Sequence, residues 1–380
     1  MIAAAHVNEI AHRVSPGLWA LAWKRLKSDH VGMVSLAIVA AFIALMLLSG
    51  LGLVAGDWAK ESGINYAPPS FLGDDVEGRA PVAPPAGAPG EPASAAQPAV
   101  ALPGADAPAA AEATDAGKSV DPLADVMADI RSGAAKEAAK GGTVTAEVRA
   151  LTLPFGGDKW GRDVLKKTVK GSQTSIFVGL AAAAVAVFLG TVFGAMAGYY
   201  GRWVDDFFNW FYSVFNSIPY LLLILAVAAV LQQKGILTII LILGLTGWTG
   251  TFRLIRGEYL KHKTREYVQA ADAIGASHMR RIFVHIFPNV SHVVLVQLSI
   301  YAVGFIKAEV ILSFLGFGVP VDVVSWGSML NEAQNELILG KWWQLAAAGT
   351  AMALLVTAFS LFTDALRDAL DPKLKGRSGA

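Results

Sequence analysis

The stretch that decides the fold of this chain covers residues 265–289 and reads REYVQAADAIGASHMRRIFVHIFPN. It is polar and rich in helix-forming residues, yet strongly apolar segments lie on both sides of it. We interpret a polar helix in such a place as a docking surface of a membrane protein.

The first part of this stretch predicts a short helix. Thr264 suits its N-cap, and Glu266 puts a negative charge in the first turn, where the helix dipole favours it. One narrow face has the i, i+3, i+4, i+7 spacing and carries Tyr267, Ala270, Ala271 and Ile274. The two alanines allow another backbone to approach closely, and Gly275 suits the left-handed position that ends a helix.

A second helix is expected after that turn. Ser277 can cap its beginning. Pro288 should end it, because proline lacks an N–H group and disfavours helical geometry at Phe287. Asn289 can then cap the apolar segment that follows.

The composition is that of a membrane protein. Hydrophobic residues form 54% of the chain and charged residues only 16%, against about 25% charged residues in soluble domains. Six segments can cross a hydrocarbon core of about 30 Å, at residues 31–55, 173–198, 207–231, 236–256, 290–314 and 343–363. Open sheets leave backbone groups unsatisfied in lipid, so we predict an all-α bundle of six transmembrane helices. The third and fourth should form a hairpin, and the first should be a retained anchor.

Lysine and arginine near the span ends predict the orientation. They are concentrated in residues 1–30, 257–289 and 364–380, which we expect on the cytoplasmic side. Residues 56–172 and 315–342 are then external. Five basic residues within 159–170 oppose this orientation, but the rule has little force in a loop of more than 100 residues.

Residues 265–289 resemble the EAA loop of ABC importer permeases. In that loop two alanines, a following glycine and a later proline form the coupling helix, which enters a groove on the ATPase subunit. The corresponding residues here are Ala270, Ala271, Gly275 and Pro288. The neighbouring residues 266–268 and 285–289 resemble the dipeptide and oligopeptide branch. Gln269 replaces the usual acidic residue, so Glu266 or Asp272 would have to form any ion pair with the ATPase.

Other segments resemble the same branch. Residues 67–70 and 153–163 look like two halves of one external signature, with departures at Leu153 and Phe155. Further matches lie at residues 198–201, 205, 218–219, 309–318, 326–327 and 364–372. The resemblance therefore covers about residues 15–375 apart from an insert at 74–150.

The insert separates those two halves. Residues 74–122 are rich in alanine and proline and are predicted to be disordered, whereas residues 122–140 have the composition of one exposed helix. Two roles remain open: a tolerated flexible extension, or a part in docking a binding protein or in gating.

The resemblance implies a type I importer permease with its core in residues 173–363 of a bacterial inner-membrane protein. The expected partners are a second, homologous permease subunit, two ATP-binding subunits and an external substrate-binding protein, with lipid around the spans. ATP and magnesium would bind to the partners, because this chain lacks the GxxxxGK[ST] phosphate loop. It is not expected to be an enzyme or to hold a cofactor or metal. It is also not expected to bind nucleic acid, since its net charge is only +1. The ATPase-coupling residues would be Glu266, Tyr267, Gln269, Ala270, Ala271, Asp272, Gly275 and Ala276.

Three residues within the spans suggest a translocation path or gate. Pro219 should kink the third span. Lys307 and Glu309 are ionisable residues near the outer end of the fifth, and their i, i+2 offset does not put them on one face. They either extend to water or line the substrate path, because an unpaired charge in lipid costs about 2.5–3.5 kcal/mol.

Di- or oligopeptides are the expected cargo, although the same branch includes permeases for nickel, glutathione and other small solutes. A secondary transporter is a separate alternative, but it would need ion-binding groups within the membrane, and only the Lys307 and Glu309 region offers them. An intramembrane enzyme is disfavoured, because no serine has a histidine partner at a shared depth.

Overall fold

The computed structural model describes residues 18–72 and 149–370. The predicted disorder of residues 74–122 and the predicted helix at 122–140 lie outside this described part. The described residues form helices and contain no strand beyond isolated bridges.

Four helical stretches are long and apolar enough to cross a membrane: α3 (His30–Gly50), α5 (Val164–Tyr200), the continuous His278–Phe314, and α14 (Trp343–Leu370). Two further pairs are bent. The first joins α6 (Arg202–Asn216) to α7 (Tyr220–Leu231) at 83°, and the second joins α8 (Ile236–Thr246) to α9 (Thr249–Lys263) at 42°. If each pair is one span, the described residues contain six, so the predicted all-α membrane fold is confirmed.

Two predicted spans are not single helices. The expected helix at 207–231 is broken because Pro219 has no N–H group and keeps Ile218 out of helical geometry. The expected helix at 236–256 bends at Gly247, which sits directly against the ring of Phe305. The predicted hairpin between these spans is confirmed, because α7 and α8 pack together and Gln232 turns the chain with a φ of +49°.

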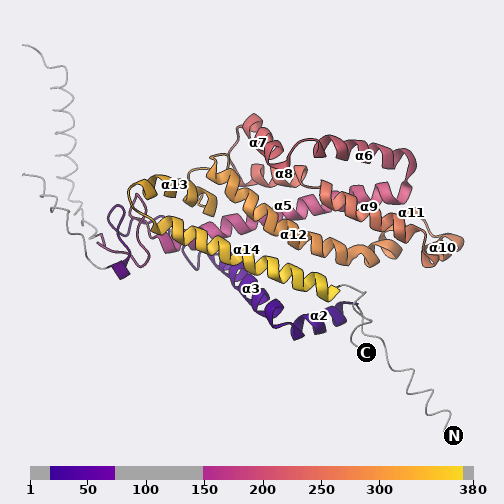
Figure 1. Ribbon diagram of the computed structural model, residues 1–380, viewed down its shortest axis with the longest axis horizontal. Coiled ribbons are helices and arrows are strands. Elements are labelled where there is room, and N and C mark those ends of the chain that lie inside the picture. The colour runs from indigo at the N-terminus through magenta and orange to yellow at the C-terminus, as the bar shows by residue number, and fades with distance from the viewer. Residues whose placement is uncertain (1–17, 73–148, 371–380) are drawn as a thin grey trace, which may run out of the picture. The chain divides into compact units, whose positions relative to one another are not determined.

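The two ends of the bundle differ. Figure 1 shows α10 (Glu266–Ala273) at one end, and α13 (Trp326–Ile338) with the loops around residues 51–72 and 149–163 at the other. We call these the α10 end and the α13 end. The short helix α2 (Leu18–Ser28) packs on α14 and α3, and η1 (Ser70–Leu72) is a single turn of 3-10 helix.

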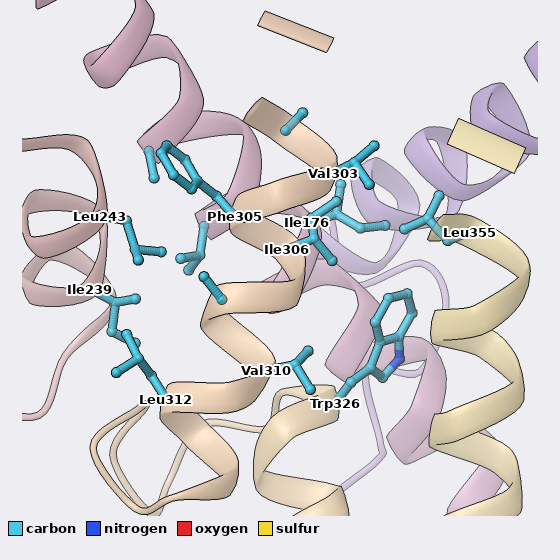
Figure 2. Close-up of a cluster of buried hydrophobic side chains, with 14 of the residues drawn as sticks. Ile176, Ile239, Leu243, Val303, Phe305, Ile306, Val310, Leu312, Trp326 and Leu355 are labelled. Carbon is cyan, nitrogen blue, oxygen red and sulfur yellow. The ribbon is translucent and has the colours of Figure 1, made fainter. Parts of the chain in front are cut away.

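The main core lies where α5, α8, α12 (Phe287–Phe314) and α14 meet. Figure 2 shows Ile176 and Ile306 in its centre, with Leu243 on one side and Leu355 on the other. Gly179 of α5 faces Ile306, and a Cβ atom at Gly179 would lie only 2.4 Å from that side chain. The two long helices therefore touch with almost nothing between them.

A ridge of glycines brings α5 equally close to α9. Gly190, Gly194 and Gly198 follow the small-xxx-small pattern expected for close helix packing in membranes. Cβ atoms at these positions would lie 2.6–2.8 Å from the backbone oxygens of Trp248, Phe252 and Arg256. Since backbone atoms cannot move aside easily, the seam requires glycine.

The two halves of the external signature pair at the α13 end. Pro69 bridges Leu153, Gly157 N donates to Ala67 O at 2.8 Å, and Tyr66 N donates to Asp158 O at 3.0 Å. The base of the loop is therefore closed by backbone hydrogen bonds on both sides of the insert.

A buried ionic cluster fixes this loop to the helices. The ammonium of Lys167 on α5 donates to Asp158 at 2.8 Å, Glu332 at 2.6 Å and Gln344 at 3.2 Å. Lys167 is 1% exposed and Asp158 is fully buried. Three acceptors replace the water that a buried ammonium loses, so the loop, α5, α13 and α14 are held at one point.

Glu336 of α13 lies beside this cluster without a hydrogen bond. It is 2% exposed, and neither carboxylate oxygen has a partner among the described residues. Burial raises the pKa of Glu336 to about 7, against the opposing attraction of Lys167.

We predict that Gly194→Ala lowers the thermal unfolding midpoint of the purified chain, because the added methyl group meets backbone atoms of α9 at 2.8–3.0 Å. Overpacking of this kind costs about 1–3 kcal/mol. The matched control is Gly257→Ala on α9, where nothing lies within 4 Å of the added carbon. The control should be neutral or slightly stabilising, since alanine favours helix by about 1 kcal/mol. Equal unfolding midpoints for the two variants would contradict the claim that the α5–α9 contact requires glycine.

We predict that Glu336→Gln is more stabilising at pH 8 than at pH 5. The pKa of the Glu336 carboxyl rises from 4.5 in the unfolded chain to about 7 in the folded chain. Between these two pH values the folded chain therefore binds a proton that the unfolded chain does not. Stability is therefore lost as pH rises from about 4.5 to 7, and the amide removes this loss. Unfolding midpoints across this range test it, with the half-exposed Glu61→Gln as control. A parental pH dependence in Glu336→Gln would refute the assignment.

Candidate functional site

The stretch at residues 265–289 forms a compact helical turn at the α10 end. α10 begins after Arg265, whose φ of −77° and ψ of 145° mark it as the N-cap. The predicted cap, Thr264, is wrong: its hydroxyl donates to Lys261 O at 3.0 Å and so completes α9 instead. The short connection between α9 and α10 leaves Thr264 within the end of the preceding helix.

Gly275 ends α10 as predicted. Its φ is +82°, and nothing lies within 4 Å of a Cβ atom built there. Ala276 N donates to Ala271 O and Gly275 N donates to Asp272 O, both at 2.9 Å. These two bonds form a Schellman motif, in which a left-handed residue lets the last carbonyls of a helix find donors.

α10 has an inner and an outer face. Val268 and Ala271 are buried at 3% and 4% exposure, whereas Ile274 is 84% exposed. Tyr267 and Ala270 are also exposed. The predicted single face is therefore wrong for Ala271, which turns inward with Val268 because these residues, three positions apart, meet the bundle. Val268 belongs to a buried cluster that includes Tyr199, Tyr259, Ile282 and Ile286.

The second predicted helix begins as expected but does not end at Pro288. The Ser277 hydroxyl accepts from Arg280 N at 3.4 Å, and α11 (His278–Arg280) follows. A π-helical turn, η2 (Arg281–Ile286), then leads directly into α12. The wide π turn makes room for the ring of Pro288, which would otherwise clash with a carbonyl one turn earlier. Asn289 is not a cap, because its amide donates to His285 O at 2.8 Å within the continuous helix.

The polar residues of the turn have different partners. Asp272 forms an ion pair with Arg281 of the π turn, so it is bound within this chain. The Gln269 amide donates to Thr264 O at 3.3 Å. Glu266 is exposed in the first turn of α10. No group of three or more metal-ligating side chains occurs within residues 18–72 and 149–370.

Comparisons with known proteins agree with this geometry. Residues 190–376 match the family described as the binding-protein-dependent transport system inner membrane component. Residues 17–69 match the N-terminal TM domain of oligopeptide transport permease C. The dipeptide transport system permease protein DppC of Bacillus subtilis is 38% identical over 221 residues, or 58% of this chain and 69% of the relative. The chain belongs to this permease family.

Two other relatives support the same assignment. The oligopeptide transport system permease protein OppC of Bacillus subtilis is 36% identical over 58% of this chain and 72% of its own length. OppC of Haemophilus influenzae is 35% identical over 58% of this chain and 70% of its own length. All three relatives are named as permease proteins of peptide transport systems.

The three intramembrane candidate residues have different surroundings. Pro219 lies at the exposed break between α6 and α7. Lys307 is exposed, whereas Glu309 is fully buried. The explanation that both side chains extend to water is therefore wrong for Glu309, because α5 and α13 cover this part of α12. Glu309 Oε1 instead accepts from the Ser313 hydroxyl at 2.7 Å, and its Oε2 has no partner among the described residues.

Three residues of the permease site were missed from the sequence. Tyr199 of α5, His278 and Arg281 meet beneath α10, with the Tyr199 hydroxyl 2.9 Å from His278 Nδ1. Tyr199 and His278 lie 79 residues apart in the chain, and their contact depends on the tertiary packing of α5. A local periodic pattern therefore carries no signal for them.

We predict that Gly275→Ala loosens α10. The left-handed conformation costs an alanine about 1–2 kcal/mol, which corresponds to roughly tenfold faster hydrogen exchange at α10 amides. Gly275→Asn should have a smaller effect, because asparagine tolerates this conformation better. The control Gly349→Ala lies in α14 with free space around the added carbon and should leave α10 unchanged. Unchanged exchange in Gly275→Ala would contradict this role.

Proposed function

We propose that this chain is the membrane-spanning subunit of an ATP-driven importer and that α10 is the surface on which an ATPase subunit docks. The observation that carries this proposal is the outer face of α10. It exposes a small residue, Ala270, beside the 84% exposed apolar Ile274, at the tip of the bundle. An exposed apolar side chain beside small residues suits a partner with a closely fitting groove.

Other subunits would complete the proposed importer. ATP and magnesium would bind to two ATPase subunits, and a second, homologous permease subunit would complete the path. The α10 end would face the cytoplasm with both termini, and the α13 end would face an external binding protein. This orientation supports a place in the bacterial inner membrane, and it accords with the basic residues 261–265 next to α10.

Di- or oligopeptides are the proposed cargo. The supporting observation is that the relatives with 35–38% identity are named as dipeptide and oligopeptide permeases. Selection among peptides is assigned to the external binding protein.

The breaks in α6–α7 and α8–α9 are proposed to line the translocation path. α6 and α9 have 15 residues each, so both breaks lie about 22 Å from the α10 end, within a membrane core of about 30 Å. Residues 217–219 are exposed and non-helical. Irregular backbone at that depth needs protein or water beside it, so Pro219 is assigned to a water-filled path shared with the second permease subunit.

The test places a charge on the outer face of α10. Ala270→Arg should abolish co-purification of the ATPase subunits and ATP-dependent uptake of a labelled dialanine probe in vesicles, because the groove must close on a small side chain. The control Val321→Arg introduces the same charge at the α13 end, at a residue 97% exposed, and should leave ATPase capture intact. ATPase capture and uptake that both persist in a folded Ala270→Arg chain would refute the docking assignment. Uptake that continues without any ATPase would favour a secondary transporter.

A further inference from the structure

Arg281 connects α10 to the rest of the bundle through several contacts. Its guanidinium forms the ion pair with Asp272 in the last turn of α10. A second nitrogen of the same group lies 2.9 Å from His278 Nδ1. The guanidinium also lies 5.8 Å from the centre of the Tyr199 ring, which is cation–π range. One side chain, itself only 13% exposed, therefore touches α10, α11 and α5.

Tyr199 receives these contacts in the last turns of α5. It is 4% exposed, and the Lys263 ammonium at the end of α9 lies 5.6 Å from its ring. Its hydroxyl lies 2.9 Å from His278 Nδ1, the same atom that Arg281 approaches. Tyr199, His278 and Arg281 therefore meet at one ring nitrogen.

The ion pair alone contributes little to stability. The Asp272 side chain is 62% exposed, and ion pairs of exposed groups are weakened by solvent. Arg281 matters because of its position, since it connects the exposed Asp272 carboxylate to the buried Tyr199 ring. The planar guanidinium keeps its donors in a fixed fork and stacks on aromatic faces, and lysine cannot reproduce this geometry.

α10 needs such a connection, because little else holds its C-terminal turn. The inner face has only two buried side chains, Val268 and Ala271, and the chain leaves α10 through the glycine turn at Gly275. An ion pair at Asp272, three residues before Gly275, therefore resists rotation of α10 about that turn.

We propose that Arg281 is a positioning residue that ties the last turn of α10 to Tyr199, so that a displacement of α10 moves α5. The inference rests on the proposed docking of an ATPase on α10. α5 is the element through which such a displacement would spread, because it packs on α3, α8, α9 and α12. The proposal also assigns Asp272 to an internal contact and leaves Glu266 as the acidic residue of α10 that faces the ATPase.

The test measures the number of ATP molecules hydrolysed per labelled dialanine imported, in vesicles that contain the complete transporter with its ATPase and binding-protein partners. Arg281→Gln should leave ATPase capture intact and raise this ratio about fivefold, the size of a coupling energy near 1 kcal/mol. Asp272→Asn should act in the same direction. Adding Asp272→Asn to Arg281→Gln should cause no further change, because both remove one contact. A purely structural role would lower the amount of folded complex and leave the ratio unchanged.

The matched control is Arg280→Gln. Arg280 is the neighbouring arginine; it is exposed, and its side chain has no polar partner among the described residues. It should keep the parental ratio. An unchanged ratio in Arg281→Gln, or additive effects of the two substitutions, would overturn the proposal. Lost ATPase capture in Arg281→Gln would also overturn it, since Arg281 would then belong to the docking surface. Failure of docking itself appears separately, as ATPase capture that survives Ala270→Arg.

Discussion

The contact on which the rest of this permease depends is the glycine seam between α5 and α9. The two backbones approach so closely that the space for a Cβ atom at Gly190, Gly194 or Gly198 is occupied by main-chain atoms of α9. In lipid the hydrophobic effect does not drive helices together, so close packing of this kind has to supply the attraction. Because α9 leads through Thr264 directly into α10, the seam also decides how the end of α5 lies relative to α10.

α5 has polar contacts at both of its ends and apolar packing between them. At the α13 end, Lys167 is bonded to the loop, α13 and α14, and at the α10 end Tyr199 meets His278 and Arg281. The 37 residues of α5 span about 55 Å. The two ends of a rigid helix anchored in this way move together. A displacement beneath α10 can therefore shift the loop at the α13 end.

The sequence predicted the parts of the site that local chemistry determines. Gly275 ended α10 because a left-handed residue was needed there, and Ser277 capped the next turn. The prediction failed where neighbouring elements decide the outcome. Pro288 did not end its helix, because a π turn made room for its ring. Ala271 turned inward because α10 packs on η2 and α9.

The sequence pattern also could not predict which charged side chains are buried. The i, i+2 offset of Lys307 and Glu309 predicted different faces, and one side chain is exposed while the other is buried. Which of them was buried depended on how α5 and α13 pack on α12, and the local pattern carries no information about that packing. Lys167 is one of the five basic residues predicted to lie in the external loop, yet its partners Glu332 and Gln344 come from helices more than 160 residues later.

The small size of α10 has a consequence for how coupling can work. A helix of eight residues is not stable alone in water, so its shape depends on Val268, Ala271 and the Arg281 contact. Any change in the bundle that shifts Tyr199 or the π turn therefore changes the surface offered to a partner. Linkage is reciprocal: if the proposed ATPase binds one arrangement of α10 more tightly, that arrangement of the bundle strengthens ATPase binding by the same factor. A minimal inner face thus makes α10 responsive in both directions, whereas a large one would fix it in a single pose.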